Sequence, residues 1–228
     1  MPEFGFADEA VHPEASREEW VFSWWAPDGS IAGWTMYRLV PGNHIWYCFG
    51  LLARDRPLLH VAEFDIARRA DPMIAKAESF WAEFVCDAPF EQWTLGSETY
   101  AVELDDPAEG LGRAYGRVVP VASDLEWYAD APLMPIAAGS QSASQTGYVQ
   151  RGVLLGTIET EQGSIEIPEL TAHRSHRWST QEIGPSPLEV ASSPILTDDT
   201  GRPLRLAFRL PDDSVWDAVL TAEGFRAR

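Results

Sequence analysis

The chain has 228 residues, enough for one large β domain or two small ones, and 35 acidic against 17 basic residues give it a formal net charge of −18. This acidity disfavours nucleic acid and anionic membrane surfaces as partners, because both are bound through basic surfaces. No apolar run approaches membrane-spanning length, and the acidic first ten residues lack the apolar core of a signal peptide. We therefore expect a soluble cytoplasmic protein, either a monomer or a homodimer.

Short strand-like runs separated by turn signals follow one another along the chain. Residues 19–26 and 31–40 predict a hairpin around Asp28-Gly29, and residues 204–210 alternate between apolar and other side chains. Further strands are expected over residues 44–53, 57–66, 99–104, 117–128, 147–159, 163–168, 171–178 and 215–221. This pattern predicts an all-β fold, an antiparallel sandwich or barrel.

Aromatic residues are abundant, with ten Trp, ten Phe and six Tyr, and such a composition favours sheets and large apolar cavities. Strand alternation places Trp20, Phe22 and Trp24 on one face. Core packing accounts for most of this pattern, but wide aromatic side chains also line barrels that hold one apolar ligand. Trp20 and Trp24 are therefore candidate ligand contacts.

One segment has two interpretations. Apolar residues from Met73 to Phe84 recur at helical spacing, whereas those from Phe80 to Cys86 alternate as in a strand. We expect a short turn or helix near residues 70–76, followed by a strand.

Asp124 and Glu126 share one face of the strand predicted over residues 117–128, and Leu125 and Trp127 share the other. Two carboxylates on one face most often form a solvated exterior. If that face lines a cavity instead, repulsion and desolvation raise the pKa of one carboxyl and make it a general acid. Both residues are therefore candidate catalytic groups.

Residues 132–146 are rich in Ala, Ser, Gln, Gly and Pro and carry no charge, a composition typical of a linker. It predicts an N-terminal β domain over residues 1–131 and a smaller C-terminal β domain over residues 147–228. The second domain is small for an independent barrel, so we expect it to pack on the first.

Polar side chains gather on strand faces after this linker. Tyr148 and Gln150 share one face, either as a strand edge bonded to a loop or as neutral groups that orient a ligand carbonyl or hydroxyl. Further on, Arg174, His176 and Trp178 also share one face and form a polar, aromatic wall.

The sequence offers little evidence for a metal or a cofactor. His173 and His176 have a spacing that pairs ligands on a helix, but on a strand it puts them on opposite faces, which favours structural or surface histidines. Cys48 and Cys86 lie in apolar runs and are expected to be buried free thiols. Glycine-rich phosphate loops, serine nucleophile elbows, CxxC pairs and HExxH helices are lacking, so we predict no metal and no cofactor.

Two C-terminal motifs carry a family resemblance. Residues 148–157, which read Tyr-Val-Gln-Arg-Gly-Val-Leu-Leu-Gly-Thr, and then residues 174–178 resemble the AttH-like/hydroxyneurosporene synthase (CrtC-like) family. Its members show a Tyr-x-Gln…Gly-x-(Val/Ile) strand followed by Arg-Asp-His-Ser-Trp-Gly. Less specific similarity at residues 17–29 and 90–95 extends the resemblance over about residues 12–180.

This chain departs from the signature at Ser175, Arg177 and Ser179, where the family has Asp, Ser and Gly. The departure at Ser175 removes any acid role from that position. The resemblance implies two packed lipocalin-like β domains with an apolar ligand site, the second incomplete because the chain is short beyond residue 180. Family activities include hydration of an isoprenoid double bond and, in related fungal proteins, Diels–Alder cyclisation.

Together these features predict a cofactor-independent enzyme that hydrates, cyclises or isomerises a hydrophobic isoprenoid or polycyclic molecule. The candidate proton donors are Asp124, Glu126 and His176. The candidate ligand contacts are Tyr148, Gln150, Arg174, Trp178, Trp20 and Trp24. The alternatives are a non-catalytic carrier of a hydrophobic molecule and a structural partner without a cavity.

Overall fold

Strands dominate the computed structural model, which describes residues 4–136, 145–181 and 193–228. The strands are β1 (Arg17–Trp25), β2 (Ile31–Val40), β3 (His44–Ala53), β4 (Arg56–Ala67), β5 (Ile74–Ala77), β6 (Phe80–Ala88), β7 (Gln92–Leu104), β8 (Arg117–Ala129), β9 (Met134–Pro135), β10 (Gln145–Thr160), β11 (Gly163–Ser179), β12 (Arg205–Arg209), β13 (Val215–Thr221) and β14 (Gly224–Ala227). Two short 3-10 helices are η1 (Phe6–Glu9) and η2 (Pro107–Leu111). Among the described residues, no helix has the length and apolar character needed to cross a membrane.

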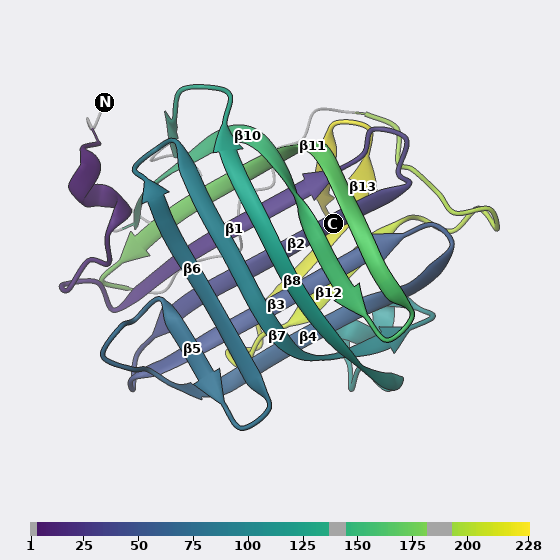
Figure 1. Ribbon diagram of the computed structural model, residues 1–228, viewed down its shortest axis with the longest axis horizontal. Coiled ribbons are helices and arrows are strands. Elements are labelled where there is room, and N and C mark those ends of the chain that lie inside the picture. The colour runs from purple at the N-terminus through teal and green to yellow at the C-terminus, as the bar shows by residue number, and fades with distance from the viewer. Residues whose placement is uncertain (1–3, 137–144, 182–192) are drawn as a thin grey trace.

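The strands form one large antiparallel sheet and one small sheet (Figure 1). The large sheet has 11 strands and runs β4-β3-β2-β1-β11-β10-β8-β7-β6-β5, with β9 beside β10. A further pairing of β4 with β7 joins its two halves, so the strands β1-β2-β3-β4-β7-β8-β10-β11 form a closed cycle. The predicted all-β antiparallel architecture is confirmed.

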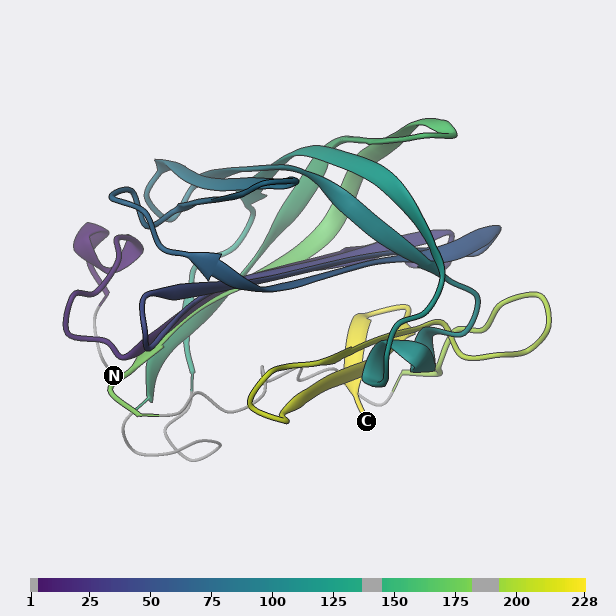
Figure 2. The same ribbon diagram turned by 90° about the horizontal axis from the view of Figure 1, so that it is seen from below.

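The elements stack in three layers, seen from the side in Figure 2. Strands β1 to β4 form the middle layer, β5 to β8 cross them on one side, and the sheet of β12 to β14 covers the other side. Strands β1 to β3 are therefore buried on both faces, and nine of the ten residues of β2 are buried. This arrangement explains why these strands read as long apolar runs rather than clean alternations.

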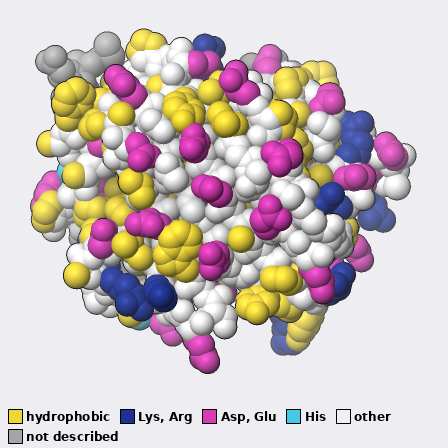
Figure 3. Space-filling view, viewed as in Figure 1, with side chains coloured by type: hydrophobic (Ala, Val, Ile, Leu, Met, Phe, Trp, Pro, Cys, Tyr) yellow, Lys and Arg dark blue, Asp and Glu magenta, His cyan; other side chains and the backbone are white. Residues whose placement is uncertain are grey.

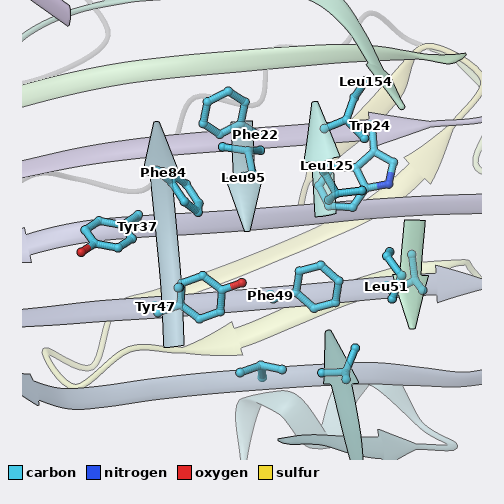
Figure 4. Close-up of a cluster of buried hydrophobic side chains, with 14 of the residues drawn as sticks. Phe22, Trp24, Tyr37, Tyr47, Phe49, Leu51, Phe84, Leu95, Leu125 and Leu154 are labelled. Carbon is cyan, nitrogen blue, oxygen red and sulfur yellow. The ribbon is translucent and has the colours of Figure 1, made fainter. Parts of the chain in front are cut away.

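Two hydrophobic clusters lie on the two faces of the middle layer. Trp20, Phe22 and Trp24 all belong to the inner cluster, between the crossing layers, as strand alternation predicted. Figure 4 shows Phe22 and Trp24 within it. Trp34 and Trp46 lie in the outer cluster, beneath the small sheet. The aromatic residues thus fill two interiors, one inside the closed cycle and one between the cycle and the C-terminal strands.

Strand pairing crosses the predicted linker. β11 pairs with β1 along the whole of β1, from Arg17 opposite Ser179 to Trp25 opposite Thr171, so both parts of the chain share one sheet. Within residues 132–146, Met134–Pro135 forms β9 against β10, and residues 137–144 lie outside the described residues. The division into two domains at this segment stays a prediction.

The segment near residues 70–84 follows one of its two interpretations. A turn, in which Asp71 accepts the N–H of Met73, leads into β5, which gains its hydrogen bonds from β6, so the expected turn and strand form and the helical alternative does not. The strands expected at 163–168 and 171–178 are one strand, β11. The pairing of β10 with β11 shifts register between Leu154 and Gly156, where β11 has one residue more than β10, and this bulge lets β11 continue past Pro168.

Candidate functional site

Four of the predicted ligand-binding or catalytic residues meet on the inner faces of β10 and β11. Tyr148 lies directly opposite His176, and Gln150 lies directly opposite Arg174. All four side chains are buried, with exposed fractions of 4% or less. The strand offset predicted from the sequence therefore brings together a phenol, an amide, a guanidinium and an imidazole.

Arg174 is held by a carboxylate from the N-terminal segment. Its Nη1 and Nη2 donate to the two oxygens of Glu9 at 3.0 and 2.5 Å, a bidentate pair. Its Nε and Nη2 also donate to Gln150 Oε1 at 3.0 and 2.6 Å. The Gln150 amide is fixed in turn, because its Nε2 donates to the carbonyls of Phe90 and Ala131, both at 3.0 Å.

Phe90 adds a backbone donor to the same carboxylate. Its N–H donates to Glu9 Oε1 at 2.9 Å, and its backbone has a positive φ of 64°, in the left-handed region that side chains other than glycine rarely adopt. Such a conformation costs on the order of 1–3 kcal/mol and is retained where the surroundings require it. Both the N–H and the carbonyl of Phe90 are thereby directed into the Arg174 site.

Aromatic rings surround the guanidinium of Arg174. Its Cζ lies 4.8 Å from the ring centroid of Trp127, 5.3 Å from that of Tyr148 and 5.8 Å from that of Trp93. Desolvated contacts of this kind stabilise a cation by up to about 2 kcal/mol. The result is a buried positive charge that aromatic rings line on one side and the Glu9 carboxylate contacts on another.

His176, the next inward-facing residue of β11 after Arg174, lies in a chain of hydrogen bonds that we call the His176 chain. Its Nε2 is 2.8 Å from Glu18 Oε1 and its Nδ1 is 3.2 Å from the hydroxyl of Tyr148. The imidazole stacks on Trp20 at 4.5 Å between centroids. His12 completes the chain, with its Nδ1 2.7 Å from the same Glu18 oxygen.

Burial sets the protonation of His176 and Tyr148. Desolvation lowers the pKa of His176, although the hydrogen bond to Glu18 opposes the shift, so the ring is neutral at neutral pH. Desolvation also raises the pKa of the Tyr148 phenol, which stays protonated. The neutral imidazole of His176 donates its Nε2–H to Glu18. Its Nδ1 lone pair is therefore free to accept a hydrogen bond from the Tyr148 hydroxyl.

The same atoms form a candidate metal site. Donor atoms of His12, Glu18 and His176 lie within 4.8 Å of one another, the only such group among the described residues. The two short separations, 2.7 and 2.8 Å, are hydrogen-bond lengths, and a tetrahedral ion would have to spread the donors apart. His173, the other half of the pair considered from the sequence, is exposed on the opposite face of β11.

Indole N–H groups around the site have no acceptor. Among the described residues, Nε1 of Trp20, Trp93 and Trp127 is buried without a hydrogen-bond partner, and so is Nε1 of Trp24 deeper in the core. Buried donors are normally satisfied, so each such group calls for an acceptor such as water or a ligand oxygen. Three of these four rings contact Arg174 or His176 directly.

The N-terminal arm, defined as residues 4–12, covers this end of the closed cycle, where β1 begins and β11 ends (Figure 1). Phe4 packs edge-on against Tyr148 and Trp178, at 4.9 and 5.9 Å. His12 stacks on Trp178 at 3.9 Å. Trp178 is thus half-buried between the arm and the strand, and the site is closed.

Asp124 and Glu126 do not join this site. They lie on the outer face of β8, Asp124 exposed and Glu126 bonded to the hydroxyl of Tyr128, while Leu125 and Trp127 point inward. Figure 3 shows acidic side chains spread over this face, with basic ones at its margin. A hollow of about 320 Å³ beside Asp124 is open to solvent and is also lined by Glu83, Glu98 and Glu159.

The departure of Arg177 from the family signature has a structural reason. Arg177 points to the opposite face of β11 and, with Arg38, binds the fully buried Glu19. Burial alone would raise the pKa of Glu19, but the two guanidinium groups lower it to about 2. This ion cluster joins β1, β2 and β11 outside the site.

Sequence reasoning missed Glu9, His12, Glu18 and Phe90. Glu18 has a signal in hindsight, since it shares strand parity with Trp20 at the start of an otherwise apolar strand. Glu9 has none, because its partner Arg174 lies more than 160 residues away along the chain. His12 lies close in sequence to its hydrogen-bond partner Glu18, but its ring contacts with His176 and Trp178 join distant segments.

Comparison with known proteins gives a family and distant structural likenesses. A family model described as "Domain of unknown function (DUF7064)" matches residues 6–204. No curated protein matches the sequence. Four solved chains match, among them "Crystal structure of CghA with Sch210972", with a TM-score of 0.34, 11% identity, and coverage of 91% of this chain and 76% of that one.

Proposed function

The chain belongs to the DUF7064 family, and from this premise we propose that it is an enzyme that moves a proton on a hydrophobic small molecule, with His176 as the base. The observation that carries the proposal is the setting of His176. Its imidazole is fully buried, tied to Glu18 and Tyr148 through its two nitrogens, and stacked on Trp20. A base oriented by a carboxylate and in contact with a second proton donor is the arrangement used in acid–base catalysis.

The proton path runs through Tyr148. Its hydroxyl is 3.2 Å from His176 Nδ1 and 3.3 Å from the carbonyl of Asp8. As the phenol passes its proton to Nδ1, its oxygen takes a proton from the ligand, and Glu18 stabilises the imidazolium that forms. The reverse transfer returns a proton to a different atom of the ligand, and the net reaction is an isomerisation, or a cyclisation that proton removal initiates and proton return completes.

The lining of the site supports an apolar ligand that carries an oxygen atom. Trp20, Trp93 and Trp127 offer ring faces to an apolar body, and their unpartnered N–H groups offer donors to a ligand oxygen. The motifs at residues 148–157 and 174–178 resemble those of the AttH-like/CrtC-like family, which favours an isoprenoid or polycyclic molecule.

The test begins with the ligand. Organic extraction of the purified protein followed by mass spectrometry is expected to recover a hydrophobic molecule, and incubation of that molecule with fresh protein is expected to convert it. Replacement His176→Gln should lower turnover by about 10²–10⁴-fold with little change in binding, because it removes the base but keeps two polar atoms.

The matched control is the double variant Asp124→Asn and Glu126→Gln. Both carboxylates lie on the outer face of β8, so this variant is expected to keep its turnover. Loss of turnover in the control, with normal turnover in His176→Gln, would contradict the proposal and indicate that Asp124 or Glu126 is the catalytic group. A ligand released unchanged by every variant would identify a carrier instead of an enzyme.

A further inference from the structure

The Arg174 site already contains a carboxylate, and it comes from the protein itself. Glu9 is 4% exposed, and its two oxygens accept hydrogen bonds from Nη1 and Nη2 of Arg174 and from the N–H of Phe90. Gln150 turns its oxygen to the guanidinium and its nitrogen away, so it supports the cation rather than the carboxylate. The pocket is thus built to accept an anion with two oxygens.

The arm that carries Glu9 is attached to the barrel mainly by side chains. Among the described arm residues, the N–H groups of Asp8 and Ala10 donate locally, to Gly5 and Ala7, and the N–H of His12 donates to the Glu18 side chain of β1 at 2.9 Å. The carbonyl of Asp8 accepts from Tyr148 at 3.3 Å, a long contact. The arm can therefore leave the site without breaking a strand pairing.

The arm has the chemistry of an apolar acid. Phe4 lies on Tyr148 and Trp178, and Phe6, which is 74% exposed, lies against Phe90. The carboxylate of Glu9 follows on the same short segment and enters the pocket. An aromatic body and a carboxylate together fill the region between Arg174 and Trp178.

We propose that the Arg174 pocket binds an apolar carboxylic acid and that Glu9 is an internal substitute which this ligand displaces. The proposal rests on the proposed function, since it names the substrate class of that site. The ligand carboxylate takes the place of the Glu9 carboxylate on Arg174 and Phe90, and its apolar body takes the place of the arm beside Tyr148 and Trp178.

The buried charge makes the exchange selective. A guanidinium with an exposed fraction of 2% cannot be left without an anion, because an unpaired buried charge is strongly unfavourable. Displacement of Glu9 is therefore coupled to the arrival of another anion, and a neutral ester or alcohol cannot replace it. The arm also lowers the apparent affinity for the acid by the fraction of molecules in which it is closed.

The experiment titrates the full chain with a fluorescent polyene fatty acid, cis-parinaric acid, and with its methyl ester. Replacement Glu9→Gln removes the competing charge and is expected to tighten binding of the acid by about tenfold or more, because the closed fraction falls. The ester cannot pair with Arg174, so it should bind both proteins weakly and with similar affinity. The matched control Glu14→Gln removes an exposed carboxylate just after the arm and should leave both affinities unchanged.

A second measurement uses the unaltered sequence and does not depend on the stability of a variant. Hydrogen exchange of the Asp8 and Ala10 amides is expected to accelerate when the acid binds and to stay unchanged with the ester. Equal tightening of acid and ester by Glu9→Gln, or arm exchange that the acid does not alter, would overturn the proposal. Neither readout involves turnover, so a failure of His176 chemistry and a failure of acid binding are distinguishable.

Discussion

Arg174 and Glu9 depend on each other for stability. Replacement Arg174→Met leaves the Glu9 carboxylate buried with the N–H of Phe90 but without its cation. We expect a loss of about 3–5 kcal/mol in the free energy of unfolding, because breaking a buried ion pair leaves an uncompensated charge. Urea unfolding followed by tryptophan fluorescence measures this loss.

The double variant Arg174→Met with Glu9→Gln removes both charges and is expected to regain much of that stability. The exposed pair Arg151 and Asp130, at 2.9 Å, provides the comparison: Arg151→Gln should cost less than about 1 kcal/mol. A double variant no more stable than Arg174→Met alone would mean that the pair does not carry the effect.

Strand parity alone located the centre of the candidate site. Tyr148, Gln150, Arg174 and His176 share buried faces because alternate residues of a strand point to the same side, and this can be read from local sequence. Glu18, the carboxylate that holds His176, shares such parity with Trp20 in β1, but the carboxylate that holds Arg174 could not be found in this way. Glu9 reaches its partner through the path of the arm, which no local pattern encodes.

Within elements, a glycine and a tryptophan set the contact between β1 and β2. Gly33 lies directly opposite Trp24, and the indole covers the glycine so closely that a Cβ there would lie 2.1 Å from Trp24 Cζ2. Replacement Gly33→Ala is expected to destabilise the fold by about 1–3 kcal/mol, because the fully buried ring has no space into which to move.

Urea unfolding again measures the effect, with Gly5→Ala as the matched control. A Cβ at Gly5 would meet no atom within 4 Å, so the control should stay within about 0.5 kcal/mol of the parent chain. Equal stability of the two variants would show that the indole moves aside without penalty.

Prediction of the elements succeeded where alternation and turn residues agree, as in the hairpin of β1 and β2. It was incomplete where a distant partner decides the structure. The strands expected at 163–168 and 171–178 are one strand, because a bulge in β11 accommodates Pro168. Residues 73–84 have apolar residues at helical spacing, but the backbone groups of β5 find partners in β6, so the strand interpretation holds. In both places pairing with another strand overrides the local preference.

At the scale of the whole molecule, His60 links the closed cycle to the C-terminal sheet. It is 4% exposed in β4 and stacks on Phe208 of β12 at 4.4 Å between ring centroids. Burial lowers its pKa from 6.5 to about 4. Between these values the unfolded chain takes up the proton and the folded chain does not, so stability falls as pH falls from 6.5 to 4, by about 3 kcal/mol at most.

Thermal unfolding between pH 7 and pH 4 checks this linkage. Replacement His60→Gln is expected to flatten the decline in melting temperature over that range, because the variant has no proton to take up at this position. His44, whose side chain is 43% exposed, supplies the control, and His44→Gln should keep the parent slope. Parallel slopes for the parent and His60→Gln would exclude His60 as the cause.

The strand order could not be predicted, although the all-β class was. The pairings of β1 with β11 and of β4 with β7 join segments far apart in the sequence, and alternation reports only which residues share a face. The charge and the abundant aromatic residues likewise describe the surface and the interior without specifying how the layers cross.

The pairing of β4 with β7 rests on three opposed residue pairs, Leu58 with Leu104, Leu59 with Glu103 and His60 with Val102. Every other junction in the cycle is longer, so we expect this one to open first in thermal fluctuations. Leu58 and Leu104 are buried in the outer cluster, and His60 stacks on Phe208 of β12. The C-terminal sheet therefore covers the shortest junction of the cycle, and its packing helps to keep the cycle closed.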